Sequence, residues 1–205
     1  MNLSPSTYLA TVDINIALPL SRFSEVFSDC FKHCYTSDRY PVIVLCIGTD
    51  RSTGDCLGPL VGHKLSAIHS NNRFLVYGTL DNPVHAKNLK ETLGEIRELY
   101  TNPFIIAVDA SLGSMERIGH ITIAEGPLRP GAGVKKTLPS VGDMHVSGVV
   151  NFGGFMEYLI LQNTRLSLVM RMANIISSGI HYSFLKRGES PSSARFVPRK
   201  DCSRV

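Results

Sequence analysis

Pro41–Ile47 reads PVIVLCI, a continuous apolar run rich in β-branched residues, and GTDRSTGDC follows it at residues 48–56. Such a run is typical of a strand that is buried on both faces. A helix is expected next, from about Pro59 to His69. Pro103–Val108 (PFIIAV) is a second run of the same kind and ends at Asp109. The stretch therefore predicts a strand, a loop and a helix, the unit from which parallel α/β sheets are built.

The flanking segments extend this pattern in both directions. Further strands are predicted at Thr11–Ile16, Arg73–Tyr77, His120–Ala124 and Met144–Val150, and helices at Phe23–Cys34 with Ser21 as N-cap, Val84–Tyr100, Phe155–Leu161 and Leu166–Lys186. Gly126–Gly142 is rich in Gly and Pro and has the length of loops that often carry function. Strands that alternate with helices predict a single α/β domain over residues 1–187 with a mostly parallel sheet.

Composition excludes several classes of protein. The chain has 205 residues, of which 43% are hydrophobic, so it can build a sizeable core. The net charge of +4 comes entirely from residues 186–205, which include six basic and two acidic residues. We therefore predict a flexible basic tail at 188–205 and no basic nucleic-acid-binding face on the folded part.

The cellular setting is predicted from cysteines and hydropathy. Five cysteines are an odd number, which is typical of free thiols in a reducing compartment. No uninterrupted run of about 18 apolar residues is present, and the first ten residues lack the basic start of a secretory signal. We expect a cytoplasmic protein without membrane contact.

Two acidic residues follow the buried strands. Asp55 lies in the loop after the first run and Asp109 closes the second. Ligands of parallel sheets bind beyond the carboxyl ends of the strands. Two carboxyl groups that face one crevice can divide their roles, one ionised as a base and the other protonated as an acid. The alternative is structural: Asp55 caps the following helix and Asp109 anchors a turn.

Other candidate residues are weaker. Cys56 could be a nucleophile, but the sequence shows no basic partner for it. His145 follows the long Gly/Pro loop and could fold back over the site as a ligand or proton carrier. Five further histidines are interpreted as ordinary surface or helix residues: His63, His69, His85, His120 and His181.

Several motifs resemble known families. Cys46–Pro59, with Val108-Asp109-Ala110 downstream, resembles the two catalytic motifs of the spore germination protease, an aspartate-dependent endopeptidase that degrades the small acid-soluble proteins of spores. The same spacing resembles the hydrogenase maturation endopeptidases, where acids at the positions of Asp55 and Asp109 bind nickel with a His. The blocks 78–86 (GTLDNPVHA), 128–133 (LRPGAG), 154–158 (GFMEY) and 161–166 (LQNTRL) resemble the YyaC-type sporulation proteins, over about residues 15–185.

The resemblance implies a phosphorylase/hydrolase-like fold with three α/β/α layers and catalytic roles for Asp55 and Asp109. Thr49 and Asp50 belong to the same loop motif, and Thr49 stands where both proteases often have Asn. His145 matches the nickel-binding His only loosely, because the intervening loop differs in length. The implied setting is sporulation, in the cytoplasm of the forespore or the mother cell.

Three hypotheses follow. The leading one is a hydrolase that cleaves peptide bonds with Asp55 and Asp109, acts on a protein or peptide substrate and needs no cofactor. The second is a metal-dependent variant in which Asp55, Asp109 and His145 hold nickel or zinc. The third is a non-catalytic peptide-binding or checkpoint protein of the same fold, which would use the Gly126–Gly142 loop. The oligomeric state is left open.

Overall fold

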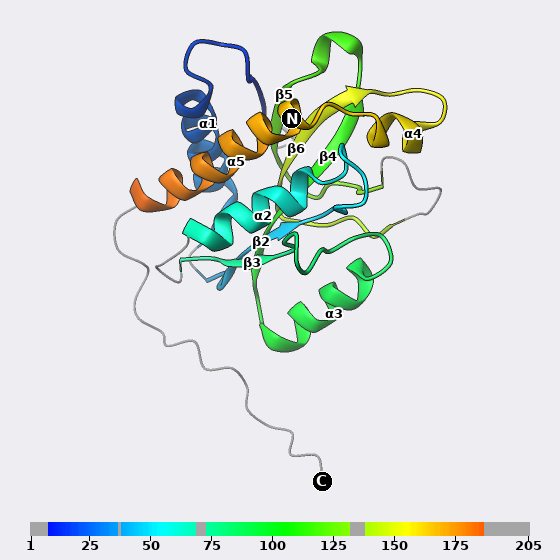
Figure 1. Cartoon of the computed structure of the whole chain (residues 1–205). Helices are drawn as coiled ribbons and strands as arrows, with labels where there is room; N and C mark the ends of the chain where they lie inside the picture. The colour runs from blue at the N-terminus through cyan, green and yellow to red at the C-terminus, as the bar shows by residue number, and fades with distance from the viewer. Residues whose placement is uncertain (1–7, 37, 69–72, 132–137, 187–205) are drawn as a thin grey trace, which may run out of the picture.

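The apolar run at residues 41–47 forms an inner strand of a six-stranded sheet in the computed structural model (Figure 1). The structure describes residues 8–36, 38–68, 73–131 and 138–186. Along the chain, its elements are β1 (Leu9–Asp13), α1 (Pro19–Cys34), β2 (Val42–Cys46), α2 (Leu57–Ile68), β3 (Leu75–Tyr77), α3 (Leu89–Leu99), β4 (Phe104–Gly113), the 3-10 turn η1 (Met115–Arg117), β5 (His120–Glu125), β6 (Met144–Phe152), α4 (Glu157–Gln162) and α5 (Leu166–Lys186).

The sheet is mostly parallel. Its strand order is β1-β5-β6-β4-β2-β3. The four strands β6, β4, β2 and β3 pair in parallel, whereas β5 is antiparallel to both β6 and β1. The predicted α/β class is therefore confirmed, and the carboxyl ends of the parallel strands meet at one edge.

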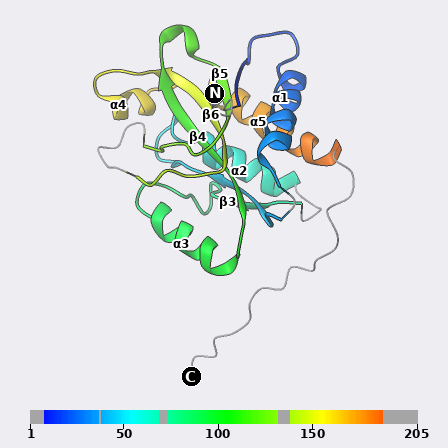
Figure 2. The same ribbon diagram turned by 180° about the vertical axis from the view of Figure 1, so that it is seen from behind.

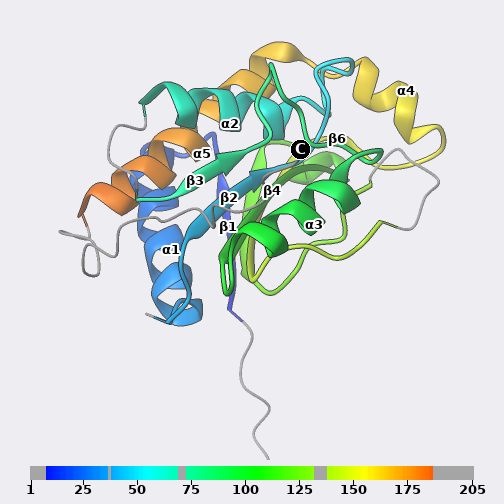
Figure 3. The same ribbon diagram turned by 90° about the horizontal axis from the view of Figure 1, so that it is seen from below.

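Helices cover both faces of the sheet. Successive side chains of a strand point to opposite faces. On one face, Val44 and Cys46 of β2 pack with α1, α2 and α5, and on the other, Ile43 and Leu45 pack with Leu89 of α3. Figures 1 and 3 show α3 on the side of the strands opposite to α2 and α5, and Figure 2 shows α1 beside α5. The layers are thus helix, sheet, helix.

The starts of α1 and α3 differ most from the prediction. α1 begins at Pro19, before the expected cap Ser21, because the fixed φ of proline suits the first helical position. α3 begins at Leu89 and not at Val84. Val84 instead extends the sheet by a bridge to Ile47. Smaller shifts affect β1, which starts and ends earlier than expected, and α4, which starts at Glu157.

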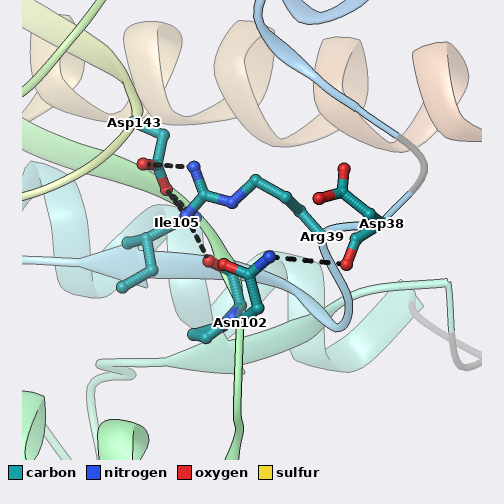
Figure 4. A network of polar contacts seen from close by, with 6 residues as sticks. Asp38, Arg39, Asn102, Ile105 and Asp143 are labelled. Carbon is teal, nitrogen blue, oxygen red and sulfur yellow. Dashed lines mark hydrogen bonds and ion pairs between the residues drawn. The ribbon is translucent and has the colours of Figure 1, made fainter.

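A charged clamp joins the beginnings of three strands (Figure 4). The Arg39 guanidinium donates to both carboxylate oxygens of Asp143, at 2.7 and 3.0 Å, and to the carbonyl oxygen of Pro103 at 2.7 Å. The Asp143 carboxylate also accepts the backbone N–H of Ile105 at 2.8 Å. Because Arg39 precedes β2, Ile105 belongs to β4 and Asp143 precedes β6, the clamp fixes the sheet at the edge opposite to the carboxyl ends.

Parts of the sequence predictions fall outside the described residues. They are His69 at the end of a predicted helix, the middle of the Gly126–Gly142 loop, at 132–137, and the basic tail at 188–205. Within the described ranges, no helix has the length and apolarity needed to cross a bilayer.

Candidate active site

Asp55 lies in the tightly folded loop between β2 and α2. Its backbone carbonyl accepts the N–H of Thr49 at 3.2 Å. Gly48 has a φ of +140°, and a Cβ at this position would lie 2.0 Å from the Asp55 carbonyl oxygen. Only glycine fits here, because both the φ and the contact exclude a side chain. The loop therefore folds back on the end of β2 and holds Asp55 beside it.

A second contact fixes the loop from the other side. Gly54 donates its N–H to the carbonyl oxygen of Leu161, at the end of α4, at 2.8 Å. A Cβ on Gly54 would lie 2.8 Å from the Thr164 hydroxyl oxygen and 3.0 Å from the Leu161 carbonyl oxygen. The close approach of these two chain segments positions the residue that precedes Asp55.

Asp109 lies inside a strand, which corrects the prediction that it closes one. β4 continues to Gly113, because β6 pairs with it past this point and places Ser147 opposite Asp109. Asp109 is 6% exposed, and its carboxylate accepts the N–H of Ala110 at 2.8 Å. By the alternation of the strand, its side chain shares the α3-facing side of the sheet with Ala107.

The two carboxyl groups influence each other. Burial raises the pKa of Asp55 to about 6, against opposing effects of the Thr49 N–H and of His85. Burial, and then the negative charge of Asp55, raise the pKa of Asp109 well above its usual range, while the Ala110 N–H acts in the opposite direction. Ionisation therefore occurs first at Asp55, and the negative charge that it creates favours the protonated form of Asp109. One base and one acid are present at the same site.

His85 belongs to this site, although the sequence prediction placed it in a helix. It lies in the loop before α3, close enough to Asp55 to lower the pKa of that carboxyl. Its backbone N–H is held by the Asn88 side chain at 2.8 Å, and its buried Nδ1 has no hydrogen-bond partner among the described residues. Pro83 and Asn88 are turn and cap signals that could have placed His85 ahead of the helix.

The remaining predicted residues have different surroundings. Thr49 contributes its backbone N–H to Asp55, while its hydroxyl donates to the exposed Asp50 at 3.4 Å. His145 lies on β6, and its Nδ1 is 2.8 Å from the carbonyl oxygen of Gly126. The Cys56 thiol donates to the Thr53 carbonyl, and burial raises the pKa of this thiol to about 11, which disfavours a thiolate.

The donor set does not fit the metal site that the second hypothesis expects. Within the described ranges, no three His, Cys, Asp or Glu side chains are grouped closely enough to hold an ion. Asp55 and Asp109 interact with each other, but His145 is turned to the Gly126 carbonyl.

The comparisons with known proteins identify the family. Residues 17–179 match the model of the family described as "Protein of unknown function (DUF1256)", and the chain belongs to this family. The chain is 59% identical over 140 residues to the uncharacterized protein YyaC of Bacillus subtilis (strain 168), an alignment that covers 68% of each chain. The structure is similar to that of the [NiFe] hydrogenase maturation protease HycI from Thermococcus kodakarensis KOD1, at 19% identity and a TM-score of 0.48, over 76% of this chain and 99% of that one.

Proposed function

We propose that this member of the DUF1256 family hydrolyses peptide bonds with Asp55 and Asp109. The observation that carries the proposal is the pair of interacting carboxyl groups, of which Asp55 ionises first and its charge raises the pKa of Asp109. General base and general acid are the two groups that hydrolysis of an amide by water requires. The sporulation setting and a protein substrate are part of the same proposal, and the motif resemblance supports them.

The chemistry follows from the protonation states. The Asp55 carboxylate takes a proton from water, and the water oxygen forms a bond to the carbonyl carbon of the peptide. The Asp109 carboxyl gives its proton to the amide nitrogen as the C–N bond breaks. A proton then passes from Asp55 to Asp109, which restores both groups. His85, beside Asp55, stabilises the ionised form of that carboxyl.

The test is cleavage of an unbiased peptide pool by the purified full chain, followed by mass spectrometry. Asp55→Asn and Asp109→Asn each remove one proton-transfer group, so each is expected to lower the cleavage rate at least about 100-fold. Asp50→Asn is the matched control, because it removes an exposed carboxylate from the same loop and keeps Asp55. Full activity in both site variants would overturn the proposal. A folded wild-type chain that binds peptides without cleaving them would favour the non-catalytic hypothesis.

A further inference from the structure

An open cavity of about 500 Å³ lies between β3 and α3. It is bounded by the end of β3, by the loop that follows this strand and by one side of α3, elements that Figures 1 and 3 show next to one another. We call it the α3 cavity. Its volume is that of a side-chain or small-ligand site. The proposed hydrolytic chemistry at Asp55 and Asp109 does not by itself require this cavity.

The α3 cavity is acidic. Asp81 and Glu95 line it, and none of its lining residues is Lys or Arg. Glu95 is exposed and has no ion pair among the described residues, and its negative charge contributes to the raised pKa of Tyr77, behind burial of the phenol and the contact with Tyr100. Tyr77 and Glu95 both line the cavity, one from β3 and the other from α3. At the rim, Asp81 lies 3.8 Å from the imidazole of His63.

The cavity reaches the candidate active site through His85. This residue lines the cavity and also acts on the carboxyl group of Asp55. The backbone continues the connection, because Gly48 donates its N–H to the carbonyl oxygen of Val84 at 2.8 Å, immediately before His85. When the peptide bond of a substrate lies at Asp55, the substrate side chain next to that bond would therefore lie close to the opening of the α3 cavity.

We propose that the α3 cavity is the substrate subsite for a basic side chain, Lys or Arg, next to the peptide bond that is cleaved. This inference rests on the proposed function and names the class of substrate. Asp81 and Glu95 line a cavity that holds no Lys or Arg, so they complement a cationic side chain, and the long apolar stem of Lys or Arg suits a cavity that opens between a strand and a helix. Glu95 is the residue that sets the preference.

The first arm of the test measures binding without catalysis. Fluorescein-labelled peptide pools of randomised sequence carry one fixed central residue: Lys, Arg, norleucine or Glu. Their binding to the Asp109→Asn chain is measured by fluorescence anisotropy. We expect the Lys and Arg pools to bind about fivefold more tightly than the norleucine pool, the contribution of a partly exposed ion pair. Added Glu95→Gln is expected to remove most of this preference, and Glu95→Lys to shift it toward the Glu pool.

The matched control is Glu98→Gln, which removes an exposed acid from the same helix outside the cavity lining. It is expected to keep the preference for Lys and Arg. Equal binding of all four pools, or a preference that neither Glu95 variant changes, would overturn the assignment of the subsite.

The second arm separates this inference from the proposed function. The wild-type chain is given the same pools, and cleavage is followed by mass spectrometry. Cleavage without a preference for Lys or Arg contradicts the subsite and leaves the hydrolase intact. Binding that depends on Lys and on Glu95 without any cleavage contradicts the hydrolase and supports a basic-peptide binding cavity.

Discussion

Asp55→Asn is expected to be more stable than the wild type, by a margin that grows as the pH rises. The reason is that the buried Asp55 carboxyl group opposes folding of the wild type once it is ionised. In the folded chain, burial raises the pKa of Asp55 from the ordinary 3.8 to about 6. The difference corresponds to about 3 kcal/mol of folding free energy. Asn has nearly the shape of the protonated acid and does not ionise, and the hydrogen bond from the Thr49 N–H to the backbone carbonyl of residue 55 does not depend on the side chain.

The sign follows from which state binds more protons. Below about pH 4, Asp55 is protonated in both the folded and the unfolded chain, and its ionisation costs nothing. Between about pH 4 and 6, the folded chain holds the proton more tightly, so the wild-type stability falls as pH rises. Above about pH 6, the full difference of about 3 kcal/mol is present. For a chain of this size it corresponds to a Tm about 6–12 °C higher in the variant.

The assay is urea or thermal unfolding of both proteins from pH 4 to 8. The measured quantity is the variant's free energy of unfolding minus that of the wild type, which is expected to grow from near zero at pH 4 to its plateau at pH 7. Asp50→Asn, in the same loop, is expected to follow the wild type throughout. A difference that stays constant with pH would refute the reasoning, because a structural effect of the substitution does not depend on ionisation of Asp55.

Two further substitutions test the elements that hold the site and the sheet. Gly54→Ala is expected to lower the free energy of unfolding by about 1–3 kcal/mol and to lower the cleavage rate, since its Cβ would lie 2.8 Å from the Thr164 hydroxyl oxygen and displace the Asp55 loop. Gly94→Ala on α3, where a Cβ meets nothing within 4 Å, is the control. It should leave the stability unchanged or slightly higher and the cleavage rate unchanged in the same assays. Asp143→Ala is expected to cost about 2–4 kcal/mol in urea unfolding, because it leaves the Arg39 guanidinium and the Ile105 N–H without their acceptor. Glu25→Ala breaks the exposed pair with Arg22 and should cost less than about 1 kcal/mol, so equal losses in these two variants would contradict the role of the clamp.

The fold was predictable where hydrophobic pattern alone decides it. Val42–Cys46 is buried at every position, and a strand that is covered on both faces leaves this signature in the sequence. The extent of β4 was not predictable in the same way. Its continuation past Asp109 depends on pairing with β6, and the sequence there, ASLG at residues 110–113, is not a run of β-branched apolar residues that would predict a strand.

Some residues of the candidate site were also predictable from the sequence, and others were not. Asp55 and Asp109 stand out in the sequence, because each follows or interrupts a buried apolar run. His85 does not, because its place depends on the bridge between Ile47 and Val84, residues that lie far apart in the chain. The Arg39–Asp143 clamp spans 104 positions and involves no local motif. Contacts of this kind arise from the assembled sheet, and single-sequence periodicity carries no information about them.

The surroundings of the two carboxyl groups give them different roles. Asp109 pairs with Ser147 of β6 and directly follows Val108, the last residue of β4 that pairs with β2, so its backbone is held in the sheet and its carboxyl group is buried. Asp55 lies on a loop and is partly exposed, with a backbone N–H and His85 favouring its ionised form. Ionisation therefore occurs first at Asp55, and its negative charge then keeps the proton on Asp109. The base is thereby the group that water can reach, and the acid is the one that the sheet holds in place.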